Sequence, residues 1–253
     1  MALRVVQWTT GNVGKRSVRA VVARPDLELV GCYAWSGDKV GRDVGELCGI
    51  DATGITATAD IDGILALKPD CVVYNPMWPD TDELVRLLEA GVNVVSTAAF
   101  IDGSGLGTDR DRIVQACERG GSSMFGTGIS PGFVELIGIA AAGICDRVDK
   151  VTIDEASDTT LYDSPETERP AGFGRPIDDP ELLPMAARGT AVFGEAVALV
   201  RRRPRRRPRR DRLRGRVRPD DRRRRNRVLD HPGRVRRRCR GELAGKGRRP
   251  DRR

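Results

Sequence analysis

The residues with the clearest capacity for chemistry lie in the first turn of the chain. Residues 4–8 (RVVQW) form a short apolar run, and residues 15–25 carry valines spaced as on one helix face. Between them stand Thr9, Thr10, Gly11, Asn12, Val13 and Gly14. This is the pyrophosphate-binding pattern G-x-G-x-x-G with threonine at the first position. Because a second apolar run follows at 27–35, the order strand, turn, helix, strand predicts a dinucleotide site. A tight turn without a ligand is the alternative.

The two remaining glycines have different expected roles. Gly11 would let the backbone approach a pyrophosphate, and Gly14 would let the helix pack closely on the strand. The phosphates would lie on the N-terminal amides of the helix that begins near Asn12.

The end of the second predicted strand bears on the choice of cofactor. An acidic residue there would hold the ribose 2′-hydroxyl of NAD. The chain instead has Ser36, followed by Asp38, Lys39 and Arg42. A small hydroxyl residue followed by cations suits a 2′-phosphate, so NADP is favoured over NAD. The alternative is a solvated loop whose charges bind nothing.

Strands and helices alternate along the rest of the first half. Strands are predicted at 68–76, at 93–100 and at the start of 122–133, and helices at 80–91 and 108–121. This order predicts an α/β, doubly wound parallel sheet. Ligands bind outside the carboxyl ends of such strands. That rule adds Tyr74, Asn75, Pro76, Thr97 and Ala98 to the expected cofactor site, together with the 126–132 turn.

From about residue 4 to 200 the chain resembles the dihydrodipicolinate reductase-like NAD(P)H-dependent oxidoreductases. The matching segments are WTTGNVG (8–14), VGRDVGEL (40–47), VVYNP (72–76), VVSTAAF (94–100), GTGISPGF (126–133) and the apolar helix VELIGIAAAGIC (134–145). The chain looks closer to the amine-dehydrogenase-like members, which include 2,4-diaminopentanoate dehydrogenase. The resemblance implies a Rossmann-type domain at 1–132, NADP or NAD as cofactor, and hydride transfer at a C=N or amine carbon of a small amino substrate. It also implies a homo-oligomer.

The expected substrate half departs from the lysine-pathway reductases. Those enzymes carry a His-His-x-His-Lys cluster between a strand and the signature D-x-P-S-G-T. Here the strand is expected at 148–158 and the later signature is Asp163–Thr167, but every histidine and lysine of the cluster is replaced. Asp158, Tyr162 and Glu155 remain as candidates to pair with a substrate ammonium and accept its proton. The alternative is a solvent-exposed turn.

Beyond residue 200 the composition changes abruptly. Residues 201–253 hold 27 Lys or Arg and six acids, whereas residues 1–200 hold 17 and 30. One interpretation is a disordered basic tail that binds polyanions non-specifically. The other is a frameshift: arginine codons of the form CGN, displaced by one nucleotide, encode Ala, Asp, Val or Gly. In that case residues 133–200 are a partial α+β substrate domain, ending in a helix from about 184 to 200, and the enzyme is impaired.

Other features of the sequence limit the class of protein. Six cysteines are scattered without a C-x-x-C pair, so neither a disulfide framework nor a metal site is expected. No apolar run approaches the roughly 20 residues of a membrane span, and the start lacks a secretory signal pattern, so the expected location is cytoplasmic. A nucleotide-binding protein without catalysis and a polyanion-binding protein remain alternatives to the oxidoreductase.

Overall fold

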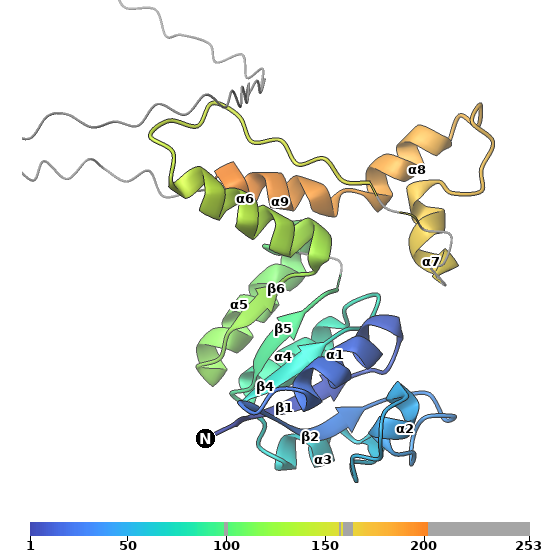
Figure 1. Cartoon of the computed structure of the whole chain (residues 1–253), viewed down its shortest axis with the longest axis vertical. Helices are drawn as coiled ribbons and strands as arrows, with labels where there is room; N and C mark the ends of the chain where they lie inside the picture. The colour runs from blue at the N-terminus through green and yellow to red at the C-terminus, as the bar shows by residue number, and fades with distance from the viewer. Residues whose placement is uncertain (99–100, 157, 159–163, 202–253) are drawn as a thin grey trace, which may run out of the picture.

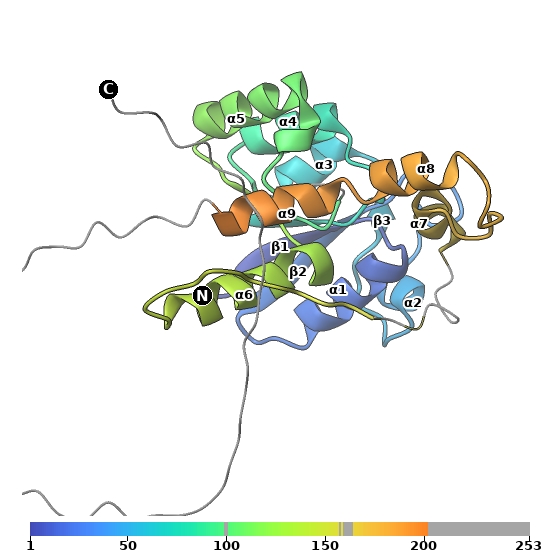
Figure 2. The same ribbon diagram turned by 90° about the horizontal axis from the view of Figure 1, so that it is seen from above.

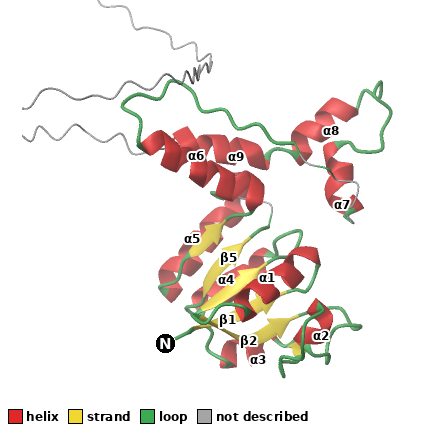
Figure 3. Ribbon diagram, viewed as in Figure 1, coloured by secondary structure: helices red, strands yellow, loops and turns green. Residues whose placement is uncertain are grey.

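A six-stranded parallel sheet forms the centre of the N-terminal half (Figures 1 and 3). The computed structural model describes residues 1–98, 101–156, 158 and 164–201. The strand order is β3-β2-β1-β4-β5-β6, which is the Rossmann topology. The strands are β1 (Leu3–Trp8), β2 (Leu27–Tyr33), β3 (Ala57–Thr58), β4 (Cys71–Tyr74), β5 (Asn93–Ser96) and β6 (Met124–Gly126). The predicted α/β class and doubly wound parallel sheet are confirmed.

Helices cover both faces of this sheet (Figure 2). One face packs against α3 (Ile61–Ala66), α4 (Thr81–Glu89) and α5 (Thr108–Gly120), and the other against α1 (Asn12–Val22) and α2 (Val44–Cys48). The helix expected at 80–91 is observed as α4, and it is capped by an aspartate: Asp80 accepts hydrogen bonds from the amides of Asp82 and Glu83. Gly91 follows the helix with a φ of 82°.

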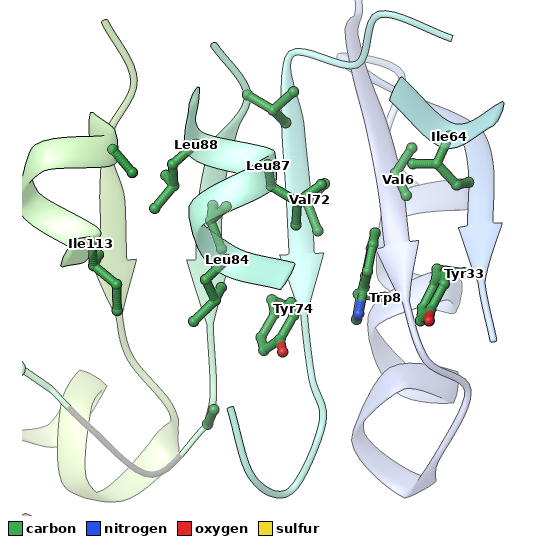
Figure 4. Close-up of a cluster of buried hydrophobic side chains, with 14 residues drawn as sticks. Val6, Trp8, Tyr33, Ile64, Val72, Tyr74, Leu84, Leu87, Leu88 and Ile113 are labelled. Atoms are coloured by element: carbon green, nitrogen blue, oxygen red, sulfur yellow. The ribbon is translucent and has the colours of Figure 1, made fainter. Parts of the chain in front are cut away.

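The larger core cluster lies between the sheet and α3, α4 and α5 (Figure 4). At its carboxyl edge Trp8 stacks on Tyr33, with ring centroids 3.9 Å apart, and on Tyr74 at 5.9 Å. Glu83 of α4 accepts hydrogen bonds from Trp8 Nε1 (2.9 Å) and the Tyr74 hydroxyl (3.1 Å). The buried polar tips of Trp8 and Tyr74 are therefore satisfied by one carboxylate.

Three short elements between residues 43 and 66 were not predicted: α2, β3 and α3. Asp43 begins α2, and its carboxylate accepts hydrogen bonds from the amides of Gly45, Glu46, Thr53 and Gly54. These bonds lower the pKa of Asp43, with the amide of Thr53 as the largest cause. The VGRDVGEL segment thus builds a capped turn.

The expected strand at 148–158 is wrong. Its described residues, 148–156 and Asp158, belong to no helix or strand. A strand needs a neighbour to receive its backbone hydrogen bonds, and the described chain places none beside it. The segment instead runs from α6 (Val134–Gly143) along the side of α6 and α9 (Val192–Arg201) that faces away from the sheet (Figure 1).

The expected single helix at about 184–200 is also wrong. It is divided into α8 (Leu182–Gly189) and α9, with Thr190 and Ala191 between them. A β-carbon on Gly189 would lie 2.3 Å from the carbonyl oxygen of Pro170, so only glycine fits at this break. A short helix, α7 (Pro165–Glu168), precedes this pair, and three irregular or 3₁₀ turns occur at Ser104–Leu106, Ile129–Phe133 and Arg169–Ala171.

Within the described residues no single helix is long and apolar enough to cross a membrane. Only α8 and α9 taken together, which meet at a 52° bend, reach that length and hydropathy. Five cysteines are described, and all are unpaired: Cys32 and Cys48 are buried, Cys71 and Cys117 half-buried, and Cys145 exposed.

Candidate nucleotide site

The β1–α1 turn has the geometry of an anion site. Gly11 is the residue before α1, and an ideal β-carbon there would meet no protein atom within 4 Å. Its φ of −73° suits any residue, so nothing within the protein requires glycine at this position. The first turn of α1 carries no acid and no side-chain cap. The positive end of the helix dipole therefore faces open space beside Gly11, as phosphate binding needs.

Gly14 is required by the protein itself. A β-carbon at this buried position would lie 2.1 Å from the carbonyl oxygen of Thr9. Thr9 has a φ of 73°, a conformation that is costly for a β-branched residue. The carbonyl of Thr9 is held by Gln7 Nε2 at 2.8 Å. Gly14 is thus closely packed as expected, whereas the expected role of Gly11 toward a pyrophosphate stays a prediction that the open space beside it allows.

A partly buried chain of hydrogen bonds connects three strand ends at this edge. Gln7 Nε2 donates to Asn75 Oδ1 at 2.9 Å, and Asn75 Nδ2 donates to Thr97 Oγ1 at 2.8 Å. These residues lie on β1, after β4 and after β5. Gln7 was not among the predicted site residues, although an amide inside the buried run VVQW is a signal that could have found it. The chain fixes Asn75 and Thr97 beside the β1–α1 turn.

The other predicted cofactor residues differ in how far their side chains are buried. The Tyr74 side chain is fully buried in the aromatic cluster, so only its main chain can face a ligand, and its carbonyl accepts the amide of Thr97 at 3.1 Å. Pro76 and Ala98 are buried, Thr97 is exposed, and Thr10 is almost fully buried. Asn12 and Val13 are exposed at the start of α1.

The loop after β2 carries a mixed charge. Ser36 donates a hydrogen bond to Asp38, which lowers the pKa of that carboxyl. Arg42 forms an ion pair with Glu46 at 2.5 Å, whereas Lys39 forms no ion pair with any residue that the structure describes. Among the described residues, Lys39 is therefore the cation of this loop without an ion pair.

The structure describes two of the three predicted catalytic residues. Glu155 and Asp158 are exposed and lie on the irregular segment beyond α6, and Tyr162 lies outside the described residues. Their catalytic roles stay predictions. Among the described residues no group of three or more His, Cys, Asp or Glu could hold a metal ion.

A separate pocket of about 310 Å³ lies between the loop after β5, α5 and β6. It is lined by Ile101, Asp102, Gly103, Leu106, Arg110, Ile113, Val114, Cys117, Glu118, Met124 and Gly126. None of these residues comes from the β1–α1 turn, although Gly126 begins the 126–132 turn of the expected cofactor site.

Comparisons with known proteins agree with this geometry. Residues 5–99 match the family model of the dihydrodipicolinate reductase N-terminus. An amine dehydrogenase from Streptomyces virginiae is 33% identical over 211 residues, which cover 79% of this chain and 59% of that protein. A 4-hydroxy-tetrahydrodipicolinate reductase from Synechococcus elongatus is 33% identical over 85 residues, covering 28% of this chain and 31% of that protein.

Among solved structures, the amine dehydrogenase of Mycobacterium smegmatis superposes with a TM-score of 0.53 at 22% identity. The match covers 59% of this chain and 46% of that one, and it shows a shared fold. The chain spans less than two thirds of the length of these relatives. The predicted resemblance is confirmed: residues 5–99 match the dihydrodipicolinate reductase N-terminal family, and the chain is more extensively similar to an amine dehydrogenase.

Proposed function

We propose that residues 1–132 form a nucleotide-binding domain for NADP or NAD, and that the chain derives from a dehydrogenase of small amino substrates. The observation that carries this proposal is the β1–α1 turn, where open space beside Gly11 meets an uncompensated helix N-terminus. Amides of Asn12, Val13 and Gly14 would bind the pyrophosphate. Thr97 and Asn75 would position the nicotinamide end, and Lys39 with Ser36 would favour a 2′-phosphate.

The bound cofactor would supply the hydride acceptor or donor, and the chain's own residues would orient it. The Gln7–Asn75–Thr97 hydrogen bonds hold the strand ends in register for that task. The similarity to an amine dehydrogenase supports an amine or imine carbon as the reacting centre. In this proposal Asp158, Tyr162 and Glu155 pair with the substrate ammonium and accept its proton.

We further propose that this chain is catalytically impaired because its substrate half is incomplete. Large apolar side chains beyond the nucleotide domain are strongly exposed: Ile144 by 89%, Ile177 by 94% and Leu183 by 80%. Such surfaces are normally covered by further structure. The absence of a strand at 148–156 is what loss of its neighbouring strands after residue 200 would produce. A nucleotide-binding protein without catalysis is the second candidate, favoured by the same observation.

Titration of NADPH and NADH followed by nicotinamide fluorescence tests the binding proposal, and reduction of NADP by a panel of small amines tests catalysis. We expect NADPH to bind and turnover to be weak or absent. Failure of both nucleotides to bind would refute the nucleotide site, and rapid amine-dependent reduction would refute the impairment. The nucleotide sequence across codon 200 tests the frameshift directly: an unshifted homologous gene that also encodes the arginine run would exclude it.

A further inference from the structure

Glu195 of α9 is a buried carboxylate held by four backbone amides of one distant loop. The residue is 7% exposed. Its Oε2 accepts hydrogen bonds from the amides of Ile101 (2.9 Å), Asp102 (2.9 Å) and Gly103 (3.1 Å). Its Oε1 accepts one from the amide of Gly105 at 2.9 Å. Four donors satisfy most of the lone pairs of a carboxylate, so this is a complete anion-binding arrangement.

The loop at 101–105 is shaped for this carboxylate. Gly103 has a φ of 74°, and the amide of Ser104 is turned away to Asp102 Oδ1 at 2.9 Å. A residue in the left-handed region between right-handed neighbours is how successive amides converge on an anion in a backbone nest. Gly105 needs no unusual φ, yet a β-carbon there would lie 2.6 Å from Glu195 Oε1. Gly105 is therefore glycine because the carboxylate approaches it.

The hydrogen bonds of the Glu195 carboxylate are long-range. Those of Asp43, the other carboxylate in the described chain that accepts four amides, are local. Asp43 bonds residues two to eleven positions away and caps its own helix. Glu195 bonds residues 90 to 94 positions away, from a helix that follows the nucleotide domain. A cap would be explained by local structure, whereas this bond joins two parts of the molecule.

We propose that the 101–105 loop is a carboxylate-binding nest and that Glu195 is a positioning residue which, by occupying it, ties α9 to the nucleotide domain. The loop begins three residues after Ala98, so the proposal extends to an effect of Glu195 on Thr97 and Ala98 at the carboxyl edge of β5. The effect on cofactor affinity rests on the proposed function. The occupation of the nest by Glu195 does not.

Three variants of the full chain test the nest by hydrogen exchange of the individual amides. Glu195→Ala removes the carboxylate, Glu195→Gln keeps its shape without the charge, and Gly105→Ala places a methyl group where Oε1 lies. Glu181→Ala, which removes an exposed carboxylate just before α8, is the control. We expect the amides of residues 101, 102, 103 and 105 to exchange at least tenfold faster in Glu195→Ala and Gly105→Ala, less so in Glu195→Gln, and unchanged in the control.

Two further measurements separate a nest from simple loosening of the chain. Acetate at tens of millimolar should restore protection in Glu195→Ala but not in Gly105→Ala, while chloride at equal ionic strength should restore neither. In the double variant, Gly105→Ala should add no further acceleration, because the contact it disturbs is already absent. Unchanged exchange at the four amides of Glu195→Ala, or additive effects in the double variant, would overturn the proposal.

The affinity for NADPH is measured separately from amide exchange. If the wild-type chain binds NADPH, we expect its Kd to rise threefold to tenfold in Glu195→Ala and to recover with acetate. An unchanged Kd would remove the positioning role while leaving the nest. If the wild-type chain binds no nucleotide, the proposed function fails, and exchange and acetate rescue still decide whether Glu195 occupies the nest.

Discussion

Substitutions at Gly11 and Gly14 should have opposite effects on stability, which separates ligand space from protein packing. A methyl group at Gly14 would lie 2.1 Å from the Thr9 carbonyl oxygen, more than 1 Å inside ordinary contact. Forcing such a group into a packed site costs about 1–3 kcal/mol. For a domain of this size each kcal/mol lowers Tm by about 2–4 °C. Gly14→Ala should therefore lower Tm by several degrees and weaken nucleotide binding, since the α1 amides must move.

Gly11→Asp should instead leave the free protein as stable as before or more so. The space beside Gly11 is open, its φ of −73° and ψ of −171° suit aspartate, and aspartate is a favoured residue before a helix. The same charge would repel a bound pyrophosphate. Two charges about 6 Å apart at an effective dielectric constant of about 20 repel by about 3 kcal/mol, which raises Kd roughly 100-fold.

Thermal unfolding and NADPH fluorescence titration measure the two quantities on the same samples. Ala20→Asp, on the exposed side of α1, is the control for net charge. The reasoning would be refuted if Gly11→Asp bound NADPH as tightly as the wild-type chain. That result would support a tight turn without a ligand. A Gly14→Ala variant with wild-type Tm would show that the turn relaxes without cost.

Four other outcomes are expected. Lys39→Ala should weaken NADPH binding roughly fivefold, for a loss of about 1 kcal/mol from one exposed charge contact, and leave NADH binding unchanged; equal effects on both nucleotides would exclude a 2′-phosphate contact. Glu83→Ala leaves Trp8 Nε1 and the Tyr74 hydroxyl without their acceptor and should cost about 1–3 kcal/mol per orphaned group in urea unfolding, with Glu83→Gln milder. Burial raises the pKa of Cys32 to about 12, so the folded state holds a proton that the unfolded state loses above about pH 9. Stability should then fall as pH rises from about 9 to 12, by about 1.4 kcal/mol per pH unit for this thiol, and Cys32→Ala should flatten that slope; an unchanged slope would show that other groups dominate. Finally, heparin binding by the full chain should fall steeply with salt and vanish when residues 201–253 are removed, because 27 cations there face six acids.

The features of this protein that depend on neighbouring residues could be predicted from its sequence. Alternating strand and helix patterns predicted the sheet, and the glycine spacing of the first turn predicted the close packing at Gly14. The helix predicted at 80–91 is observed as α4, with Asp80 before it and Gly91 after it. These features can be predicted because each depends on residues a few positions apart in the sequence. Their periodicity and φ preferences are properties of the local sequence.

Only the tertiary structure decided the rest, because it depends on partners far along the chain. Gln7 meets Asn75 across 68 residues, and Glu195 meets Ile101 across 94. Tyr74 was expected at the ligand, but its ring fills the core beneath α4. The 148–158 segment has a strand-like sequence, yet its described residues form no strand, since a strand exists only where a neighbour accepts its hydrogen bonds. The local sequence pattern limits which secondary structures a segment can form. Contacts with residues far along the chain decide which of them it adopts.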